Sequence, residues 1–584
     1  MSKHKIQNKK VFILLFAILI LGLSFHFDFF IWHYLYAQDG ELEITIDAAS
    51  ATIPLPKVFR PNVDLSGRGF HHDPGWPQAL AAKEVLDIWH KEIGFRGVYR
   101  LQYNLWEISQ LAKDKEAQGR LLANYENVIK SISDAGGIVI LDIFGTPAGL
   151  GKVLDKKSPP FNLKAFKELI KSTIRELSCD KRYNVWYEVW NAPDLDDFFL
   201  GRKQEYFNLY RTVAESIKEL ETEMKVHIPI GGPAVSWWFQ NLDGNTIATP
   251  QKSLIYELIK FCYRLRLPLD FISWHAFSTD PEAEKENTTY KNTAVNLVRE
   301  WLTYFKFDRN TPLIVDEWNY DRSANVLPER KEKSFIAASY IPARIKNMYE
   351  AGVDYQAYFC LEDFKNNKEG VVRNVGIFSF DPEYSGYNGA PKAAYSVFRM
   401  LANLGPDMFL TKPQDEFTGL IATKGKDRFT VIIYNYSDPE IVNNYLSRNI
   451  AALRKAERKI LLNFIKQGTI EKITSGEIEI AGLRATKKIK ALLKKAKELS
   501  VMAAEHSLSG RRANLNINNL PKGDYTYQRF AVDSSCSMDC KFAPVDAKEI
   551  RAADAYQERL ELSPYSVQMI ILERKPAEIK QNEG

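Results

Sequence analysis

The chain has 584 residues, which is too long for one hydrophobic core, because single cores stop growing near about 250–300 residues. Hydrophobic residues make up 45% of the chain and aromatic residues 12%, so it can bury enough apolar surface to fold, and global disorder is excluded. The formal net charge is only +5, from 78 basic and 73 acidic residues, so charge gives no argument for nucleic-acid binding by the whole chain.

The first residues are typical of a targeting segment. Four lysines precede an almost purely apolar run over residues 11–25, about the ~7–15 residue length of a signal-peptide core. Residues 35–37 loosely fit a cleavage site before Gln38. Without cleavage, residues 11–37 would be long enough to span a bilayer, which takes about 20 residues. We expect an exported protein, periplasmic or extracellular, with residues 1–38 as a signal peptide or an inner-membrane anchor.

Between residues 39 and 404, short apolar runs alternate with amphipathic stretches. Residues 41–48 also alternate polar and apolar side chains and read as a strand. Repeated alternation of strands and helices over this length predicts an α/β fold, a parallel sheet closed into a (β/α)8 TIM barrel. Seven strand runs are clear, and a segment around residues 57–65 could supply the eighth. The seven are residues 97–101, 137–144, 185–189, 227–230, 271–274, 313–315 and 355–359.

Residues 405–584 follow another pattern, in which strand-like runs separated by Gly, Asp and Pro predict an antiparallel β-sandwich. A helical insertion at about residues 439–509, rich in Leu, Ala, Lys and Arg, interrupts them, and two helices fit there. Lysines crowd the second helix, near residues 484–506. They form either a solvated helix face or a basic surface for an anionic polysaccharide or a membrane.

The cysteines divide into two groups. Export would permit disulfides, and Cys536 and Cys540 lie close enough in sequence for a local one. Zinc is the weaker interpretation there, because no further Cys or His pair lies nearby to complete four ligands. Cys179, Cys262 and Cys360 stand in apolar surroundings and read as buried thiols.

Carboxyl groups that directly follow a strand are candidates for catalysis, because barrel active sites lie at the C-terminal ends of the strands. Residues 311–320 (TPLIVDEWNY) run from a strand straight into Asp316 and Glu317. Since neighbouring side chains on a strand point to opposite sides, only one of these two should face inward. Trp318 would add apolar bulk beside the site. Acids at strand ends are also common in loops, so this motif alone does not decide the function.

A second motif, residues 187–194 (YEVWNAPD), resembles the Trp-Asn-Glu-Pro signature that closes the fourth strand in a clan of retaining glycosidases. Together with the acidic strand above, three further motifs follow in the same order as in glycoside hydrolase family 39, which includes β-xylosidases, α-L-iduronidases and some exopolysaccharide hydrolases. They are residues 231–234 (GGPA), 270–275 (DFISWH) and 389–395 (GAPKAAY). The resemblance implies a barrel with a β-sandwich, double displacement with retention of configuration, and no metal or other cofactor.

The resemblance carries over with clear departures. Glu317 aligns with the family nucleophile, but Ala192 stands at the acid/base glutamate, and losing a general acid typically costs ~10²–10⁴ in rate. Phe277 stands where the family often has a tyrosine hydroxyl. Another acid, or a carboxyl group of the substrate, could supply the proton; the protein could bind glycans without cleaving them; or the sequence could carry an engineered Glu-to-Ala change. The acids near strand ends are Asp194, Asp316, Glu362 and Asp363.

The expected substrate-binding residues each have a structural alternative. Asn191 would hydrogen-bond the sugar 2-hydroxyl, or cap a turn. Arg100 ends an apolar strand, where an inward charge needs a carboxylate, so it either supports Glu317 or lies at the surface. His275 would orient the nucleophile, or be a satisfied core histidine. The set is completed by Trp318 and Trp238, which stack on sugars or pack in the core, and by Asp363.

The sequence therefore predicts a glycoside hydrolase-like protein that acts on a poly- or oligosaccharide by a retaining mechanism, with Glu317 as nucleophile and an altered or missing acid/base. The alternative is a catalytically inactive glycan-binding protein on the same scaffold.

Overall fold

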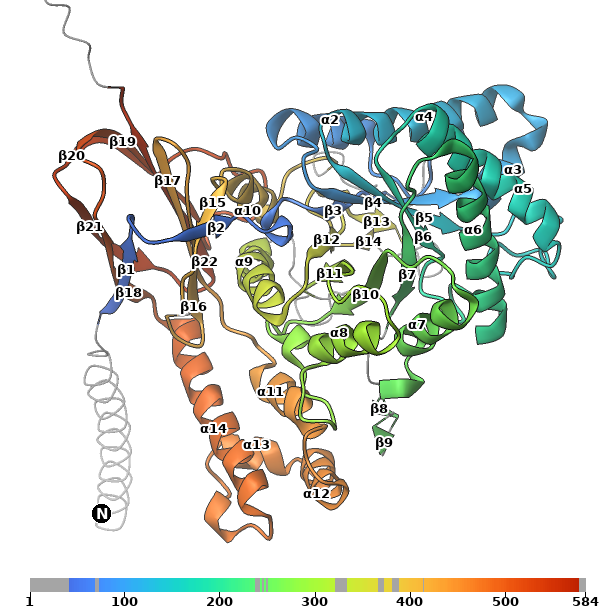
Figure 1. The fold of residues 1–584 in the computed structure, drawn as a ribbon. Helices are drawn as coiled ribbons and strands as arrows, with labels where there is room; N and C mark the ends of the chain where they lie inside the picture. Colours follow the sequence, from blue (N-terminus) through green and yellow to red (C-terminus); the bar gives the residue numbers. More distant parts are fainter. Residues whose placement is uncertain are drawn as a thin grey trace, which may run out of the picture.

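A computed structural model describes residues 41–68, 73–236, 242–243, 246–247, 250–320, 333–365, 372–380, 388–412 and 414–576. The predicted leader and Trp238 lie outside these ranges. A barrel, a two-sheet domain and a group of helices make up the described chain (Figure 1). Within those ranges, no helix combines the length and the apolar character needed to cross a bilayer.

The barrel is closed by eight parallel strands, as the alternation predicts. The eighth strand falls inside the segment proposed for it and pairs with both its neighbours. One prediction is displaced: the strand expected at residues 227–230 begins at Ile230 and continues through a Gly-Gly-Pro run that reads as a turn in the sequence. The strands are β3 (Val63–Asp64), β4 (Val98–Asn104), β5 (Ile138–Phe144), β6 (Val185–Val189), β7 (Ile230–Val235), β10 (Phe271–Phe277), β11 (Leu313–Asn319) and β12 (Tyr355–Phe359).

Helices surround the barrel and bury their apolar faces on it (Figure 1). Several begin at a side chain that accepts a hydrogen bond from a free backbone N–H, as Asp114 does from Ala117 at 3.0 Å. The helices are α2 (Lys83–Glu92), α3 (Leu105–Gln110), α4 (Lys115–Asp134), α5 (Leu163–Ile174), α6 (Lys203–Met224), α7 (Leu254–Leu265), α8 (Ala294–Tyr304), α9 (Ser334–Ala351) and α10 (Ala393–Ala402). Two short hairpins are also present, β8 (Leu242–Asp243) with β9 (Thr246–Ile247) and β13 (Phe364–Lys365) with β14 (Val372–Arg373).

The interior of the barrel changes from apolar to charged along the strands. Toward the N-terminal ends of the strands, the interior is filled by a small apolar cluster that contains Val98, Ile140, Phe271, Ile314 and, partly buried, Trp186. Side chains on a strand repeat every second residue, so the next inward position on each of these strands lies two residues further on. Those positions are held by Arg100, Asp142, Ser273, Asp316 and Glu188. The barrel interior therefore has a polar layer next to the apolar one, on the side of the C-terminal ends of the strands.

The second domain is a two-sheet sandwich around a separate apolar core, as predicted. Residues 41–54, which the sequence analysis placed with the barrel, belong instead to this domain, because alternation in residues 41–48 identifies a strand but not its sheet. The Cys536–Cys540 disulfide is present, and Cys179, Cys262 and Cys360 are buried thiols. One sheet holds β1 (Leu42–Asp47), β18 (Arg511–Asn518) and β21 (Ala555–Leu562); the other holds β2 (Thr52–Pro54), β15 (Asp407–Phe409), β16 (Thr418–Lys424), β17 (Arg428–Asn435), β22 (Ser566–Arg574), β19 (Gly523–Val532) and β20 (Asp546–Ala552).

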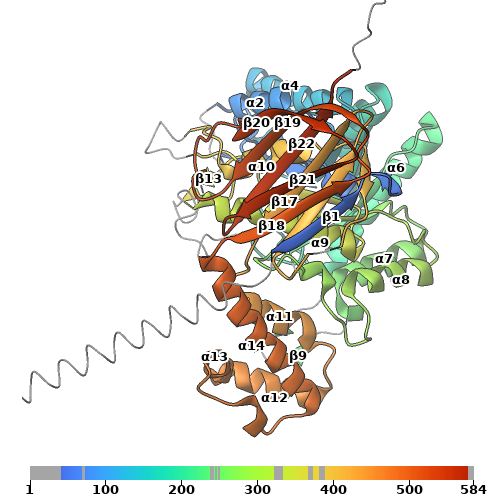
Figure 2. The same ribbon diagram turned by 90° about the vertical axis from the view of Figure 1, so that its left-hand side faces the viewer.

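The predicted helical insertion lies between β17 and β18 and projects from the sandwich (Figure 2). It contains four α-helices rather than two, because short loops divide the helical pattern. They pack around a core of their own, which includes Leu446, Leu461, Ile473 and Leu493. The helices are α11 (Ile441–Ile450), α12 (Lys455–Lys466), α13 (Thr469–Thr474) and α14 (Lys487–Leu508).

Candidate active site

A β-bulge at the end of β11 brings two neighbouring acids to the same side of the strand. In the pairing with β10, Trp274 lies opposite Val315 but His275 lies opposite Glu317, so Asp316 is the extra residue. Both carboxyl groups consequently reach the guanidinium of Arg100, at 2.5 Å for Glu317 Oε1 and 3.6 Å for Asp316 Oδ2. The expectation that only one would face inward is wrong, because the bulge breaks the alternation. Glu317 keeps 8% of its surface exposed and Asp316 none, so Glu317 is the one that opens outward.

Arg100 is the centre of a buried charge cluster. Besides the two acids on β11, its Nε donates to Glu188 at 2.7 Å and its Nη1 to Asp64 at 3.1 Å, and Asp142 lies 3.5 Å from Nη2. Ser273 donates a further hydrogen bond to Glu188 at 2.6 Å. The predicted support of Glu317 by Arg100 is present. Sequence reasoning missed Asp64, Asp142 and Glu188 as its partners, although an acid at an inward position of a neighbouring strand was the available signal.

Position 192 lies at the same end of the barrel as Glu317. Arg100 Nη2 donates to Asn191 Oδ1 at 3.0 Å, so one guanidinium contacts both the nucleophile candidate and the residue before Ala192. Ala192 itself is buried, and its N–H donates to the carbonyl of Ala234 at 3.0 Å. Its φ of 42° is left-handed, which costs a non-glycine residue roughly 1–2 kcal/mol. The loop after β6 thus holds a strained backbone at Ala192, the position where the family resemblance predicts an acid/base glutamate.

Several carboxyl groups of the cluster have pKa values above their usual range. Burial raises the pKa of Glu317 to about 8, against the opposing effect of Arg100. Burial also raises the pKa of Asp142 to about 7. The pKa of Asp316 lies well above its usual value because the group is buried and Glu188 lies nearby. Neutral forms therefore reduce the negative charge around the single guanidinium, and Glu317 ionises in the mildly alkaline range.

His275 lies beside the nucleophile candidate, as the sequence predicts. Its Nδ1 is 3.5 Å from Glu317 Oε2, and its Nε2 is 3.9 Å from Asp316 Oδ1. Burial, with a smaller contribution from Arg100, lowers the pKa of His275 well below its usual value. The ring is therefore neutral and carries one N–H, which limits it to a single donated hydrogen bond in this cluster.

Two residues predicted to bind substrate have other roles. Trp318 is fully buried on the outer side of β11, where it packs on Tyr340 and Tyr358 and donates to Gln356 at 2.7 Å. The next residue along a strand from an inward Glu317 must point outward, so the prediction that Trp318 flanks the sugar is wrong. Asp363 is also fully buried, and its carboxylate binds Lys392 Nζ at 2.6 Å and the Gly376 N–H at 2.7 Å. It braces the loops after β12 instead of facing a ligand.

The four acids proposed as replacement proton donors differ in accessibility. Asp316 and Asp363 are fully buried, and so is Glu362, which pairs with Arg68 at 2.9 Å. Asp194 is exposed and lies two residues after Ala192, where it accepts hydrogen bonds from Ser236 N–H at 3.0 Å and Ser236 Oγ at 2.8 Å. Of the four, only Asp194 can exchange protons directly with solvent.

Within the described residues, no group of three or more His, Cys, Asp or Glu side chains is placed to hold a metal ion. The clustered carboxyl groups face the guanidinium of Arg100 instead.

Comparison with known proteins identifies the family. Residues 145–475 match the family model described as glycosyl hydrolases family 39. The chain belongs to that family. This family 39 chain is 25% identical over 298 residues to a β-xylosidase of Caldicellulosiruptor saccharolyticus, covering 48% of the chain and 55% of the relative. It is 25% identical over 287 residues to a β-xylosidase of Geobacillus stearothermophilus, covering 46% and 51%. The chain thus matches about half the length of these curated relatives.

The fold agrees with that assignment. The crystal structure of a glucosidase from Croceicoccus marinus is similar to this family 39 chain with a TM-score of 0.61 and 16% identity, over 92% of the chain and 100% of that protein. At this identity the likeness concerns the fold alone. The predicted family, the TIM barrel and the second β domain are therefore confirmed.

Proposed function

We propose that this family 39 chain is a retaining glycosidase that has kept its nucleophile, Glu317, and lost the general acid at position 192. One observation carries the proposal: Arg100 contacts Glu317 at 2.5 Å and Asn191 at 3.0 Å, so an accessible carboxyl group and the altered acid/base position lie on the same end of the barrel.

In the first step, Glu317 attacks the anomeric carbon, and the bond to the leaving oxygen breaks as the bond to the carboxylate forms. Arg100 fixes one carboxylate oxygen, which aims the other at the sugar. Because the amide oxygen of Asn191 accepts from Arg100, its NH₂ group is available to donate to a sugar 2-hydroxyl. In the second step, water displaces Glu317, its proton passes to solvent or to a base outside this cluster, and two inversions give net retention.

The missing acid defines which substrates turn over. A leaving group that departs as a stable anion needs no protonation, whereas a sugar hydroxyl does, and general acid catalysis is worth ~10²–10⁴. Activated glycosides should therefore react much faster than poly- or oligosaccharides, unless Asp194 or a carboxyl group of the substrate supplies the proton. The β-xylosidase relatives support xylosides as the first probes.

Glycan binding without turnover is the second candidate, and Ala192 is the specific observation that favours it. A glycosidase scaffold without its acid/base can retain a sugar-binding cleft while hydrolysis falls below detection.

Covalent labelling separates the two candidates. The full chain is incubated with 2-deoxy-2-fluoro glycosides that carry a dinitrophenolate leaving group, in a panel of xylosyl, glucosyl and arabinosyl forms. We expect one glycosyl adduct on the peptide that contains Glu317, read by mass spectrometry. Glu317→Gln should abolish the adduct, whereas Glu107→Gln, which alters a buried glutamate outside the cluster, should not. An unlabelled chain that still binds glycans would replace this proposal with the second candidate.

A further inference from the structure

The helical insertion carries most of the excess positive charge of the molecule. Residues 439–509 contain 14 basic and 7 acidic side chains, a net charge of +7. The whole chain carries only +5, so the remaining residues together carry −2. A strongly basic subdomain on an otherwise balanced protein indicates an anionic partner, since like charges repel each other within a folded unit.

The structure provides few internal partners for these cations. Three of them form ion pairs: Arg448 with Asp280 and Glu282, Lys494 with Glu498, and Lys495 with Glu416. Lys488 and Lys490 donate to backbone carbonyls of the insertion. The other nine side chains make no ion pair with any described residue, and most are exposed. They are Arg454, Lys455, Arg458, Lys459, Lys466, Lys472, Arg484, Lys487 and Lys497.

The unpaired cations are ordered by the helices that carry them. On α12, Lys455, Lys459 and Lys466 recur at intervals of four and seven residues, which places them on one face. On α14, the unpaired Lys487 and Lys497 lie on one face with Lys494, at intervals of seven and three residues, and Lys494 also pairs with Glu498 of the same helix at 3.9 Å. The opposite faces bury the apolar core of the insertion. Folding therefore fixes these charges in two stripes instead of leaving them on a flexible tail.

The start of the described chain lies beside this insertion. β1 runs parallel to β18 with Leu42 opposite Ala513, so residue 41 lies opposite residue 512, four residues after α14 ends at Leu508 (Figures 1 and 2). Glu41 also accepts a hydrogen bond from Asn514 at 2.8 Å. A chain of four residues spans at most about 14 Å. If residues 11–37 occupy a bilayer as their composition predicts, the four residues from 37 to 41 and the four from 508 to 512 each add at most about 14 Å, and the strand spacing adds about 5 Å. The base of the insertion is then held within about 33 Å of the membrane surface.

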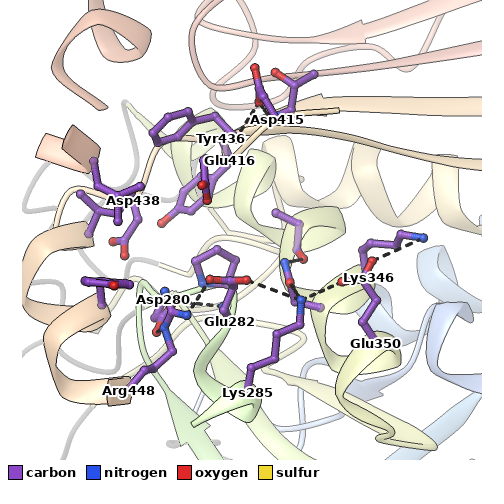
Figure 3. A pocket seen from close by; sticks show the side chains of 18 of the residues that line it. Asp280, Glu282, Lys285, Lys346, Glu350, Asp415, Glu416, Tyr436, Asp438 and Arg448 are labelled. Carbon is purple, nitrogen blue, oxygen red and sulfur yellow. Dashed lines mark hydrogen bonds and ion pairs between the residues drawn. The ribbon is translucent and has the colours of Figure 1, made fainter. Parts of the chain in front are cut away.

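The insertion is also fixed to the barrel. Arg448 of α11 reaches the loop after β10, where it contacts Asp280 at 2.7 Å and Glu282 at 2.6 Å (Figure 3). These residues line a cavity of about 210 Å³ between the barrel, the sandwich and the insertion. Lys285 and Glu350 close another side of it with an ion pair at 2.7 Å. A surface that binds through the insertion would therefore orient the barrel as well.

We infer that the helical insertion binds the anionic phospholipid headgroups of the membrane that holds the first residues of the chain. An anionic polysaccharide is the less favoured occupant, because five carboxyl groups face one guanidinium in the active site and give a polyanion no electrostatic guidance toward it. A bilayer bound by the insertion would not have to enter the active site, so the charge there does not count against it. This inference does not depend on whether the barrel hydrolyses glycosides.

Lysine reactivity in bilayers tests the inference. The full chain is reconstituted into nanodiscs of phosphatidylcholine alone or of phosphatidylcholine mixed with phosphatidylglycerol, and acetylation rates are read by mass spectrometry. Contact with anionic lipid should slow acetylation of Lys455, Lys459, Lys466 and Lys487 about fivefold, and high salt should restore it. Four exposed lysines of α2 and α4, on the side opposite the insertion in Figure 1, should react equally in both discs. They are Lys83, Lys91, Lys115 and Lys130.

Two matched variants separate binding from folding. Replacing the four insertion lysines by Gln should remove the lipid-dependent protection of Lys494 and Lys497, with an unchanged melting temperature. Replacing the four lysines of α2 and α4 by Gln should leave that protection intact. The inference is overturned if the chain fails to associate with the discs, if the rates are equal in both lipid compositions, or if a polyuronate protects the insertion where phosphatidylglycerol does not.

Discussion

The two sides of the active site differ in how deeply they are built into the fold. On the β11 side, Glu317 is held by Arg100 at 2.5 Å, with His275 3.5 Å away, inside a cluster that occupies the barrel interior. On the β6 side, Ala192 lies in a loop and contributes a methyl group. Glu317, the proposed nucleophile, is thus part of the packed barrel, whereas Ala192, at the proposed acid position, makes no contact that needs a carboxyl group. A side-chain change at position 192 should therefore leave the packing around Glu317 intact.

Introducing a glutamate at position 192, on the β6 side, is the change with the largest expected effect on activity. Ala192→Glu should raise kcat/KM for glycosides with poor leaving groups by ~10²–10⁴, because the new carboxyl group can protonate the departing oxygen. With activated aryl glycosides, the same variant should raise the rate of the first step only slightly, because their leaving groups need no protonation. Ala192→Gln, with the same shape and no acidic proton, is the matched control. The comparison fails if the glutamine variant gains as much, or if neither variant gains while Glu317 can still be labelled.

Removing Arg100, which holds Glu317 on the β11 side, should lower the stability of the whole protein. Arg100→Met leaves buried carboxyl groups without their cation, and breaking such a pair costs about 3–5 kcal/mol. Urea unfolding measures the loss. Arg344, which is equally buried but meets one carboxyl group, Glu284, at 2.5 Å, provides the control as Arg344→Met, with a smaller expected loss. Equal losses would mean that the Arg100 cluster has no special structural role.

The pH dependence reports the ionisation of Glu317. Because burial raises its pKa to about 8, the reactive carboxylate, and with it the rate on activated glycosides, should rise with pH and level off above that value. The free energy of unfolding should change with pH in the opposite direction to the rate, and fall as the pH rises. The folded state binds the proton more tightly than the unfolded chain, so this group's contribution is complete at acid pH and is lost as the pH rises toward 8. A rate that is already flat from pH 5 upward would contradict the assignment.

The smallest effect on catalysis should come from Trp318. Trp318→Phe removes the hydrogen bond to Gln356 and part of the packing on Tyr340, at a cost of about 1–2 kcal/mol in unfolding free energy. The labelling rate of Glu317 should stay within about twofold, since the indole faces away from the site. A large loss of labelling at unchanged stability would return Trp318 to the substrate-binding set.

The sequence predicted the architecture better than the site. Alternating strands and helices predict a barrel, and strand-end acids point to Glu317, because both depend on local periodicity. The bulge at Asp316 could not be predicted, since it depends on pairing with β10 and leaves no local signal in residues 311–320. The same limit explains the errors over Trp318 and Asp363, whose directions are set by register and by Lys392.

The fate of residues 41–54 has a similar cause. Their alternation predicts a strand with one buried face, but the partner strands of the sandwich lie several hundred residues further along the chain. The acids that surround Arg100 also come from separate strands, β3, β5 and β6, and only the closed barrel brings them together.

Azide provides the most direct test of a site with a nucleophile but no acid/base. With an activated glycoside, azide should enter the space left at position 192 and displace Glu317 from the glycosyl-enzyme without needing a base. Proton NMR of the product then decides. We expect a glycosyl azide of the same anomeric configuration as the substrate, formed faster than the hydrolysis product. A glycosyl azide of inverted configuration would show that azide attacks the substrate directly, and would contradict the assignment of Glu317 as nucleophile.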